Sequence, residues 1–376
     1  MKMKIGDIST YIKRGITPKY VVENGYAIVN QKCIRNGKVN YEYIKYTDIH
    51  KKYNEEKKVK QGDILINSTG TGTLGRVAYV DKNAFYTYVD SHVTILRCEN
   101  YNSKFLYYWL SSLEKYIESL GKGSTNQIEL NKDAIEEIEI PKLDLEQQNI
   151  VVENLSTYDD LIENNERQIK LLEEAAQRLY KEWFVDLHFP GYEDVAIVDG
   201  VPEGWNKELI ENVIGKVSRT KQIKTADYLL EGSIPIIDQS RDFIAGYTND
   251  SDALVNIGTP VIVFGDHTRI LKYIQFPFAK GADGTQLIIS NRTNMPQSLL
   301  YLSLIAVDLS NYHYARHFKY LKAESILIPS QDVADEFDRL ISQFFSQIQK
   351  LREKCYKLIQ ARDRLLPKLM SGEIEV

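Results

Sequence analysis

Cysteine and long apolar runs are scarce in this sequence. Its 376 residues include three cysteines, Cys33, Cys98 and Cys355, which lie far apart and form no CxxC pair. This spacing argues against a zinc site and a disulfide framework, and it fits a reducing compartment. No apolar run approaches the roughly 18 residues that span a bilayer, and the N-terminal stretch lacks the apolar core of a secretion signal. We therefore expect a soluble, cytoplasmic protein.

Motifs for several common chemistries are missing as well. The sequence contains no P-loop, no GxSxG and no convincing cluster of nuclease carboxylates. Two prolines never stand together, which excludes the Asn/Asp-Pro-Pro-aromatic tetrad of amino-methyltransferases. No spacing typical of metal ligands is present. We expect no catalytic residue, no metal and no cofactor in this chain.

Two stretches carry apolar residues at alternating steps of four and three, which is typical of coiled-coil helices. Adding 186 to a position in the first stretch gives its counterpart in the second, as from Val151 to Phe337. Asn165 and Arg362 are polar members of these stripes; we interpret them as determinants of helix register, with a partner-protein surface as the alternative. The residues expected to pair the helices or dock a partner are Val151, Leu155, Tyr158, Ile162, Asn165, Ile169, Leu172, Leu179, Trp183, Phe337, Ile341, Phe344, Ile348, Leu351, Leu358 and Leu365.

One register in two long helices, each preceded by a globular stretch, indicates a duplicated unit. The predicted fold is α+β: two mixed α/β domains separated by two long helices that form an antiparallel coiled coil with pseudo-two-fold duplication. Periodicity alone leaves parallel pairing open. The predicted divisions are a first domain, a first helix, a connector with the second domain, and a second helix with its tail, at 1–143, 144–187, 188–329 and 330–376.

Within the first domain, short runs rich in β-branched and aromatic residues predict strands. Helical spacing covers 105–120, and residues 135–141 are expected to form a closing strand. Asp144 followed by Gln147 resembles a helix N-cap with glutamine at the third helical position. The second long helix is expected to stop near Pro367.

The segment Gly70–Gly75 matches GxGxxG, but a strand-like stretch follows it where a dinucleotide site needs a helix. A glycine-rich loop with short polar side chains suits a close approach to DNA. A tight hairpin loop without such a role is an equally good interpretation. The candidate DNA contacts here are Asn67, Ser68, Thr69, Thr71, Thr73 and Arg76.

The corresponding place in the second domain contains Asp266 and His267, which as a pair could suggest a catalytic dyad. With no nucleophile motif nearby, polar contacts of the loop are the better interpretation, including Arg269 with a guanine edge. The candidates from this loop are His267, Thr268 and Arg269.

The formal net charge of −5 argues mildly against nucleic-acid binding, but the charges are unevenly distributed. Residues 1–141 hold 21 Lys and Arg against 17 Asp and Glu, whereas residues 142–184 hold 5 against 10. Basic clusters at 216–224 and 314–322 suit phosphate contacts, although a solvated surface explains a charge run equally simply. The candidates are Arg219, Lys221, Arg316, His317 and Lys319, with Lys51-Lys52 and Lys57-Lys58 in the first domain.

This arrangement resembles the specificity subunit of type I restriction–modification enzymes over essentially the whole chain. The duplicated order of domain and helix carries the resemblance more than any single motif does. One departure is Asp335-Glu336, where the family has a Gln-Gln pair at the entry of the second helix. The similar segments are IEIP at 138–141, LEQQ at 145–148, EEAAQRL at 173–179, ILIP at 326–329, QARDRLL at 360–366 and KLMSGEI at 368–374.

The resemblance implies a non-catalytic DNA reader whose two target-recognition domains bind an asymmetric, two-part site in double-stranded DNA. The helices would space these domains and dock two modification subunits. Those partners would bind S-adenosylmethionine and methylate adenine N6, and a motor-nuclease restriction subunit is a further partner that the resemblance allows. The alternative, from another class of protein, is a coiled-coil interaction scaffold whose globular domains bind protein or glycan.

Overall fold

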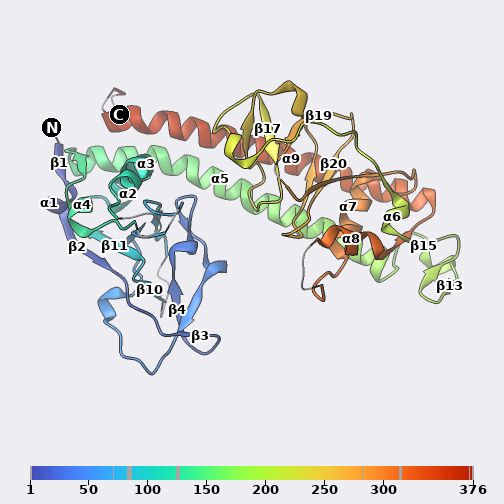
Figure 1. The fold of residues 1–376 in the computed structure, drawn as a ribbon, viewed down its shortest axis with the longest axis horizontal. Coiled ribbons are helices and arrows are strands. Elements are labelled where there is room, and N and C mark those ends of the chain that lie inside the picture. Colours follow the sequence, from blue (N-terminus) through green and yellow to red (C-terminus); the bar gives the residue numbers. More distant parts are fainter. Residues whose placement is uncertain are drawn as a thin grey trace. The chain divides into compact units, whose positions relative to one another are not determined.

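The computed structural model describes residues 2–70, 72–82, 87–123, 128–281, 283–312, 316–371 and 373–374. The chain forms two compact units. The first unit combines residues 1–163 with 355–376, and the second comprises residues 164–354. Each unit contains a globular part together with a section of both long helices (Figure 1). The predicted domain boundaries, which leave both helices undivided, remain predictions.

The first unit is built on a six-stranded sheet with the order β2-β11-β8-β9-β6-β5. Its central strand β8 is buried along its whole length, as its sequence ILIN favours. The strands of this sheet are β2 (Ser9–Arg14), β5 (Ile34–Arg35), β6 (Lys38–Val39), β8 (Ile64–Asn67), β9 (Val77–Tyr79) and β11 (Val93–Cys98). The short helices of the unit are α1 (Ile5–Ile8), α2 (Ser103–Ser112), α3 (Glu114–Ser119) and α4 (Lys132–Glu136).

A second sheet of the first unit has four strands in the order β10-β4-β7-β3. In the first unit, β3 and β4 lie on the side away from helix α5 (Figure 1). The strands are β3 (Tyr20–Val21), β4 (Tyr26–Val29), β7 (Lys45–Thr47) and β10 (Thr87–Val89), and a separate pair joins β1 (Lys2–Lys4) to β12 (Glu139–Pro141).

The second unit repeats this plan with two four-stranded sheets, ordered β16-β23-β20-β21 and β18-β17-β22-β19. Its helices are α6 (Ile210–Val213), α7 (Gln297–Ala306) and α8 (His317–Ala323). The strands of the two sheets are β16 (Ile214–Gly215), β17 (Ile234–Ile237), β18 (Gly246–Thr248), β19 (Leu254–Val255), β20 (Val261–Gly265), β21 (Leu271–Ile274), β22 (Phe278–Lys280) and β23 (Thr285–Ser290). Two strand pairs complete the unit: β13 (Ile197–Val198) with β14 (Val201–Pro202), and β15 (Asn206–Leu209) with β24 (Ser325–Ile328).

The long helices are α5 (Leu145–Tyr180), continued by a π-helical turn at Lys181–Val185, and α9 (Gln331–Ser371). The predicted N-cap of α5 is confirmed. The backbone N–H of Gln147 donates to Asp144 Oδ1 at 2.8 Å, and the Gln147 side chain accepts from the Asp144 N–H at 3.1 Å. These two bonds form a capping box that satisfies two amides at the helix start.

The helices run antiparallel within each unit, as predicted. In the first unit, Arg362 of α9 bonds Asp159 of α5 at 2.7 Å. Three residues further along α5, Ile162 lies beside Cys355, which comes earlier in α9. In the second unit, Phe184 of the π-helical turn packs edge-on against Phe337 near the start of α9, with ring centroids 4.8 Å apart.

Most of the predicted stripe lies on the buried side of the helices. Val151, Leu155 and Ile162 of α5 are 1%, 0% and 6% exposed. Asn165 is also buried, and its amide nitrogen has no hydrogen-bond partner in the described chain. On α9, Phe345 is the more buried member of the Phe344–Phe345 pair, because its ring packs 4.5 Å from that of Tyr273. Register control by Asn165 and partner docking by the stripe remain predictions.

Three local predictions are corrected. Helix α9 continues through Pro367 to Ser371, since Leu369 and Met370 are buried in the core of the first unit and offset the local cost of proline. The predicted helix over 105–120 is divided at Leu113 into α2 and α3. The expected closing strand over 135–141 begins as helix α4, which Asn131 caps by accepting from the Ala134 N–H at 2.9 Å.

Candidate nucleic-acid interface

The glycine-rich loop of the first unit connects β8 to β9 and is held from inside the fold. Asn67 and Ser68 are fully buried. Asn67 Nδ2 donates to the backbone carbonyl of Gln31 at 3.0 Å, and the Ser68 hydroxyl lies 2.5 Å from that of Thr94. The Thr69 hydroxyl donates to Gln31 Oε1 at 3.3 Å. These side chains therefore fix the shape of the loop.

The remaining polar residues of this loop also bond within it. The Thr73 hydroxyl donates to the Gly70 carbonyl at 3.2 Å, and Arg76 Nη2 donates to the Gly72 carbonyl at 2.9 Å. Thr71 lies outside the described residues. Gly70 has a φ of 104°, a left-handed conformation that glycine adopts without strain. Contact of this loop with DNA stays a prediction.

The loop after β20 in the second unit is held by Gln239 in a similar way. Gln239 Oε1 accepts from the His267 N–H at 3.1 Å, and its Nε2 donates to the Asp283 carbonyl at 2.8 Å. The Thr268 hydroxyl donates to the Gln239 carbonyl at 2.7 Å. His267 and Thr268 are exposed, so this loop presents side chains that a ligand can reach.

Backbone hydrogen bonds place the two loops in equivalent positions. In the first unit, Ser68 N donates to His92 O, and Leu130 N donates to Ser68 O, both at 2.9 Å. In the second unit, Asp266 N donates to Gly284 O at 2.7 Å, and the N–H of His317, the first residue of α8, donates to Asp266 O at 2.9 Å. Ser68 and Asp266 therefore occupy the same place in two copies of one frame.

Arg269 and His317 face each other beneath the second loop. Arg269 Nη2 donates to the Tyr312 carbonyl at 2.9 Å, and its Nε donates to His317 Nε2 at 3.3 Å. His317 is 5% exposed, and burial, followed by the nearby Arg269 charge, lowers its pKa. Two donors of the Arg269 guanidinium are thus engaged inside the unit, and its contact with a guanine edge stays a prediction.

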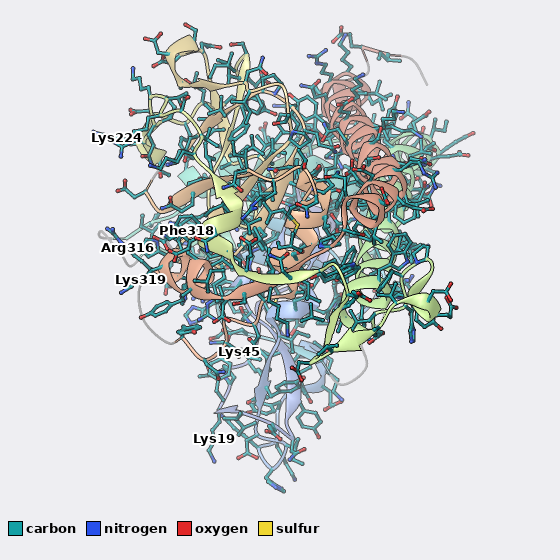
Figure 2. All side chains as sticks on the ribbon, turned by 90° about the vertical axis from the view of Figure 1, so that its right-hand side faces the viewer. Lys19, Lys45, Lys224, Arg316, Phe318 and Lys319 are labelled. Carbon is teal, nitrogen blue, oxygen red and sulfur yellow. The ribbon has the colours of Figure 1, made fainter. Side chains whose placement is uncertain are left out.

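Several basic side chains of the second unit reach solvent (Figure 2). Arg219, Arg316 and Lys319 are exposed, as is Lys221, which bonds Asp250 at 2.6 Å. Phe318 is half-buried between Arg316 and Lys319 and packs on Phe264 with centroids 5.9 Å apart. This arrangement of basic and aromatic side chains suits a phosphate backbone.

Two hollows open on the surface of the second unit. The first, of about 360 Å³, is lined by Asp266, His267, Asp283, Gly284, Gln286 and Arg316. The second, of about 480 Å³, is lined by Val217, Ser218, Arg219, Thr220, Gln222, Lys280, Gln286 and Leu287. Gln286 lines both hollows, so its side chain lies where they meet.

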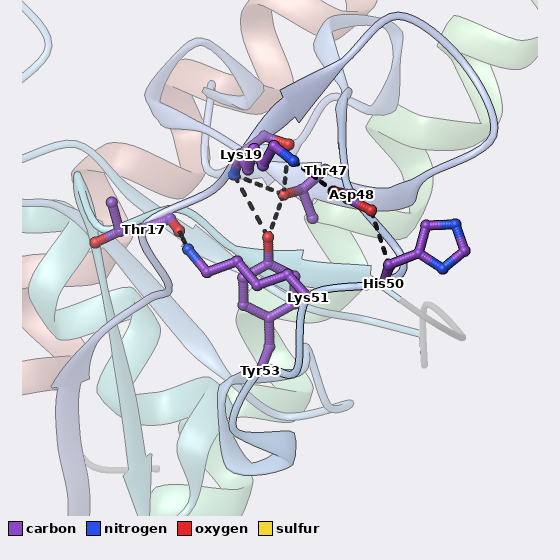
Figure 3. Close-up of polar contacts among 7 residues, drawn as sticks. All are labelled: Thr17, Lys19, Thr47, Asp48, His50, Lys51 and Tyr53. Atoms are coloured by element: carbon purple, nitrogen blue, oxygen red, sulfur yellow. Dashed lines mark hydrogen bonds and ion pairs between the residues drawn. The ribbon is translucent and has the colours of Figure 1, made fainter.

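The four-stranded sheet of the first unit carries a basic corner, which is formed by Thr17, Lys19, Thr47, Asp48, His50, Lys51 and Tyr53 (Figure 3). Buried Thr47 accepts from the Lys19 N–H at 2.9 Å, and its hydroxyl lies 2.6 Å from that of Tyr53. Asp48 accepts from the His50 N–H at 2.8 Å and pairs with Lys19 at 3.0 Å; these contacts lower the pKa of Asp48. The corner is therefore a fixed structure with lysine ammonium groups at its surface.

The residues predicted from the sequence did not include Lys19 of the basic corner, exposed Lys45 of β7, or Lys280 and Gln286, which line the hollows. A local charge count contains a signal for the first two, because residues 13–60 hold twelve Lys and Arg against five Asp and Glu. The rest of residues 1–141 holds nine against twelve. Nothing comparable marks Gln286, which stands in an ordinary strand sequence and acquires its position only through the fold.

Nowhere among the described residues do three His, Cys, Asp or Glu side chains gather as a metal ion requires. Their helices likewise include none with the length and apolar character needed to cross a bilayer.

Comparison with known proteins adds sequence and fold relationships. Residues 1–174 match the family model of the type I restriction modification DNA specificity domain. The chain is 26% identical over 372 residues to the MjaIX specificity subunit of Methanocaldococcus jannaschii, covering 90% of this chain and 85% of that one. It is 30% identical over 208 residues to the HindI specificity subunit of Haemophilus influenzae, covering 52% and 43%.

The fold has a counterpart among solved structures. The crystal structure of a type I restriction–modification S subunit from Mycoplasma genitalium aligns with a TM-score of 0.55 at 18% identity. That alignment covers 98% of this chain and 96% of the other. At this level of identity the likeness concerns the fold.

Proposed function

We propose that this chain is a specificity subunit of the type I restriction–modification family and that it reads a two-part DNA target, one part with each globular region. It acts as the sequence-recognition subunit and leaves catalysis to its partners. The two regions differ in side chains, so the two parts of the target differ in sequence.

One observation carries this proposal: the same hydrogen-bonded frame holds a different loop in each unit. Gln31 supports the loop after β8, and Gln239 supports the loop after β20. A rigid frame that presents variable side chains is what sequence readout requires, because base edges are distinguished by the placement of donors and acceptors.

The partners follow from the same proposal. Two modification subunits dock on the long helices, bind S-adenosylmethionine and methylate adenine N6, and a restriction subunit joins them to cut unmethylated DNA. The acidic stretch at 142–184 favours protein docking over phosphate contact there. The helices join the two recognition regions and set the gap between the half-sites.

A map of N6-methyladenine tests the function. DNA from cells that express this chain with its neighbouring methyltransferase is compared with DNA from cells lacking this chain. A two-part asymmetric motif that disappears with the chain is expected. An assembled and active complex whose methylation does not depend on this chain would contradict the proposal.

Salt dependence separates DNA reading from the scaffold alternative. A DNA reader exchanges counterions for basic side chains, so its affinity for duplex falls steeply as salt rises. A scaffold that binds protein or glycan is not expected to bind duplex DNA with an affinity that falls steeply as salt rises. Purified complex titrated with a labelled duplex at several salt concentrations gives the answer directly.

A further inference from the structure

Gln286 lies where the two hollows of the second unit meet, and its side chain is free to bind. It stands on β23 opposite Phe264 of β20. It is half-buried, and its amide makes no hydrogen bond with any residue that the structure describes. By contrast, Gln222 in the same hollow donates to the Gly281 carbonyl at 2.9 Å. Gln286 therefore offers one acceptor and two donors in a concave place.

The second hollow brings two cations together. Arg219 is exposed and Lys280 is half-buried, and neither has an ion-pair partner in the described chain. Burial, followed by the charge of Arg219, lowers the pKa of Lys280. Two close positive charges repel each other, and an anion placed between them relieves that repulsion. This hollow has the chemistry of a phosphate site.

The first hollow has a different chemistry. It contains the carboxylates of Asp266 and Asp283 beside His267 and Arg316. Asp266 is occupied, since its Oδ1 accepts from the Phe318 N–H at 2.8 Å. Asp283 is exposed and would repel a phosphate, whereas a carboxylate can accept from the amino group of a base. The mixture of donors and acceptors therefore suits base edges.

We propose that the two hollows form one DNA-reading groove in which Gln286 reads an adenine and the pair Arg219–Lys280 holds a backbone phosphate. This inference rests on the proposed function and assigns the residues of the second half-site. A glutamine amide donates to adenine N7 and accepts from N6, a bidentate pattern that the other bases do not offer in the major groove.

Two substitutions of Gln286 test the base contact, each in the assembled complex with its modification subunits. Gln286→Ala should lower discrimination at one position of one half-site by about tenfold to a hundredfold, the value of one bidentate contact. Gln286→Glu loses the donor to N7 and keeps acceptors, so preference there should move from adenine to cytosine. The measurement is binding to duplexes in which each base of the motif is replaced in turn.

The matched control is Asn212→Ala, because Asn212 carries an exposed amide on α6, away from the long helices, and lines neither hollow. It should leave discrimination at every position unchanged. If the wild-type complex has a two-part motif and both Gln286 variants read it unaltered, the base contact is wrong while the proposed function stands. If the wild-type complex has no motif that depends on this chain, the function and this inference fail together.

Arg219→Ala tests the phosphate contact. Affinity should fall for every sequence alike, and the slope of log affinity against log salt should decrease by about one. Lys207→Ala removes one positive charge from β15, outside both hollows, and is the control for net charge. Equal effects of the two substitutions would overturn the phosphate site. A loss confined to one base position would assign Arg219 to base reading instead.

Discussion

The two units share a strand register but place different side chains on it. In the first unit, Ile66 of β8 pairs with Thr94 of β11; in the second, Phe264 of β20 pairs with Gln286 of β23. Thr94 is 3% exposed and its hydroxyl lies 2.5 Å from that of Ser68, whereas Gln286 lines two hollows at the surface. The same position in the strand pairing therefore holds a buried side chain in the first unit and a solvent-accessible one in the second.

A neighbouring position shows the same kind of difference. Ala78 pairs with Leu65 in the first unit, and Lys272 pairs with Val263 in the second. Both residues are buried, but Lys272 donates its ammonium protons to the carbonyls of Asp238 and Asp242, at 2.9 and 2.5 Å. The backbone frame therefore tolerates a methyl group or a buried charge. Recognition can change through single side chains while the frame stays the same.

The largest expected effect comes from a core substitution that destabilises one unit and leaves the other folded. Phe337→Ala removes a fully buried ring that packs on Trp183 at 5.4 Å and on Phe184 at 4.8 Å. We expect the free energy of unfolding of the second unit to fall by about 3–5 kcal/mol. Amide hydrogen exchange followed by mass spectrometry should show the loss in peptides of residues 188–330, with little change in residues 2–120.

The reverse experiment uses Leu369→Ala, because Leu369 is 3% exposed in the core of the first unit. It should destabilise the first unit by about 2–5 kcal/mol and leave the globular part of the second protected. Equal losses of protection in both units, from either substitution, would show that they unfold as one body.

The sequence predicted the duplicated plan because long-period patterns survive local variation. The heptad stripe locates both helices, and Asp144 with Gln147 marks the start of α5, since capping depends on a few adjacent residues. The predicted end of α9 near Pro367 was wrong, because burial of Leu369 and Met370 outweighs the low helix propensity of proline.

Much of the candidate site could not be predicted in this way. Gln286 and Arg219 are 67 positions apart in the sequence, and only the sheet brings them to one hollow. The buried hydroxyls of Ser68 and Thr94 likewise look like ordinary surface residues until β8 pairs with β11. Spacing predicts such contacts only where both partners lie on one helix or one turn.

The second expected effect concerns the buried Lys272. Burial lowers its pKa from 10.5 to about 8, against the opposing influence of Asp238 and Asp242. Between these two pH values the unfolded chain holds a proton that the folded chain has released, so stability rises with pH there. The difference corresponds to about 3 kcal/mol of charge penalty that is fully present below pH 8.

Lys272→Met should remove that part of the pH dependence. Urea unfolding at pH 7.5, 9 and 10.5, pH values chosen around the interval (about 8 to 10.5) in which the lysine titrates, should give a flatter curve for the variant than for the wild type. The alanine at the equivalent place in the first unit shows that the frame accepts an uncharged side chain. Parallel curves for the two proteins would mean that Lys272 titrates alike in the folded and unfolded chains.

The smallest effect and the sharpest comparison come from the two glutamines that support the loops. Gln239→Ala removes the bonds to the His267 N–H and the Asp283 carbonyl. Gln31→Ala removes only the longer of two contacts of the Thr69 hydroxyl, which keeps His92 Nδ1 at 2.7 Å. At about 1 kcal/mol per hydrogen bond, we expect Gln239→Ala to weaken discrimination several-fold at the second half-site. Gln31→Ala should have a lesser effect, confined to the first.

Gln239→Glu distinguishes the two bonds, because it keeps the acceptor for His267 and loses the donor to Asp283. Because its carboxylate oxygen would face the Asp283 carbonyl oxygen, its effect should equal or exceed that of Gln239→Ala when binding is measured on duplexes that vary one half-site at a time. Loss of discrimination at both half-sites from a single substitution would contradict independent loops. It would mean that each frame affects the other, and that the two units read their target together rather than separately.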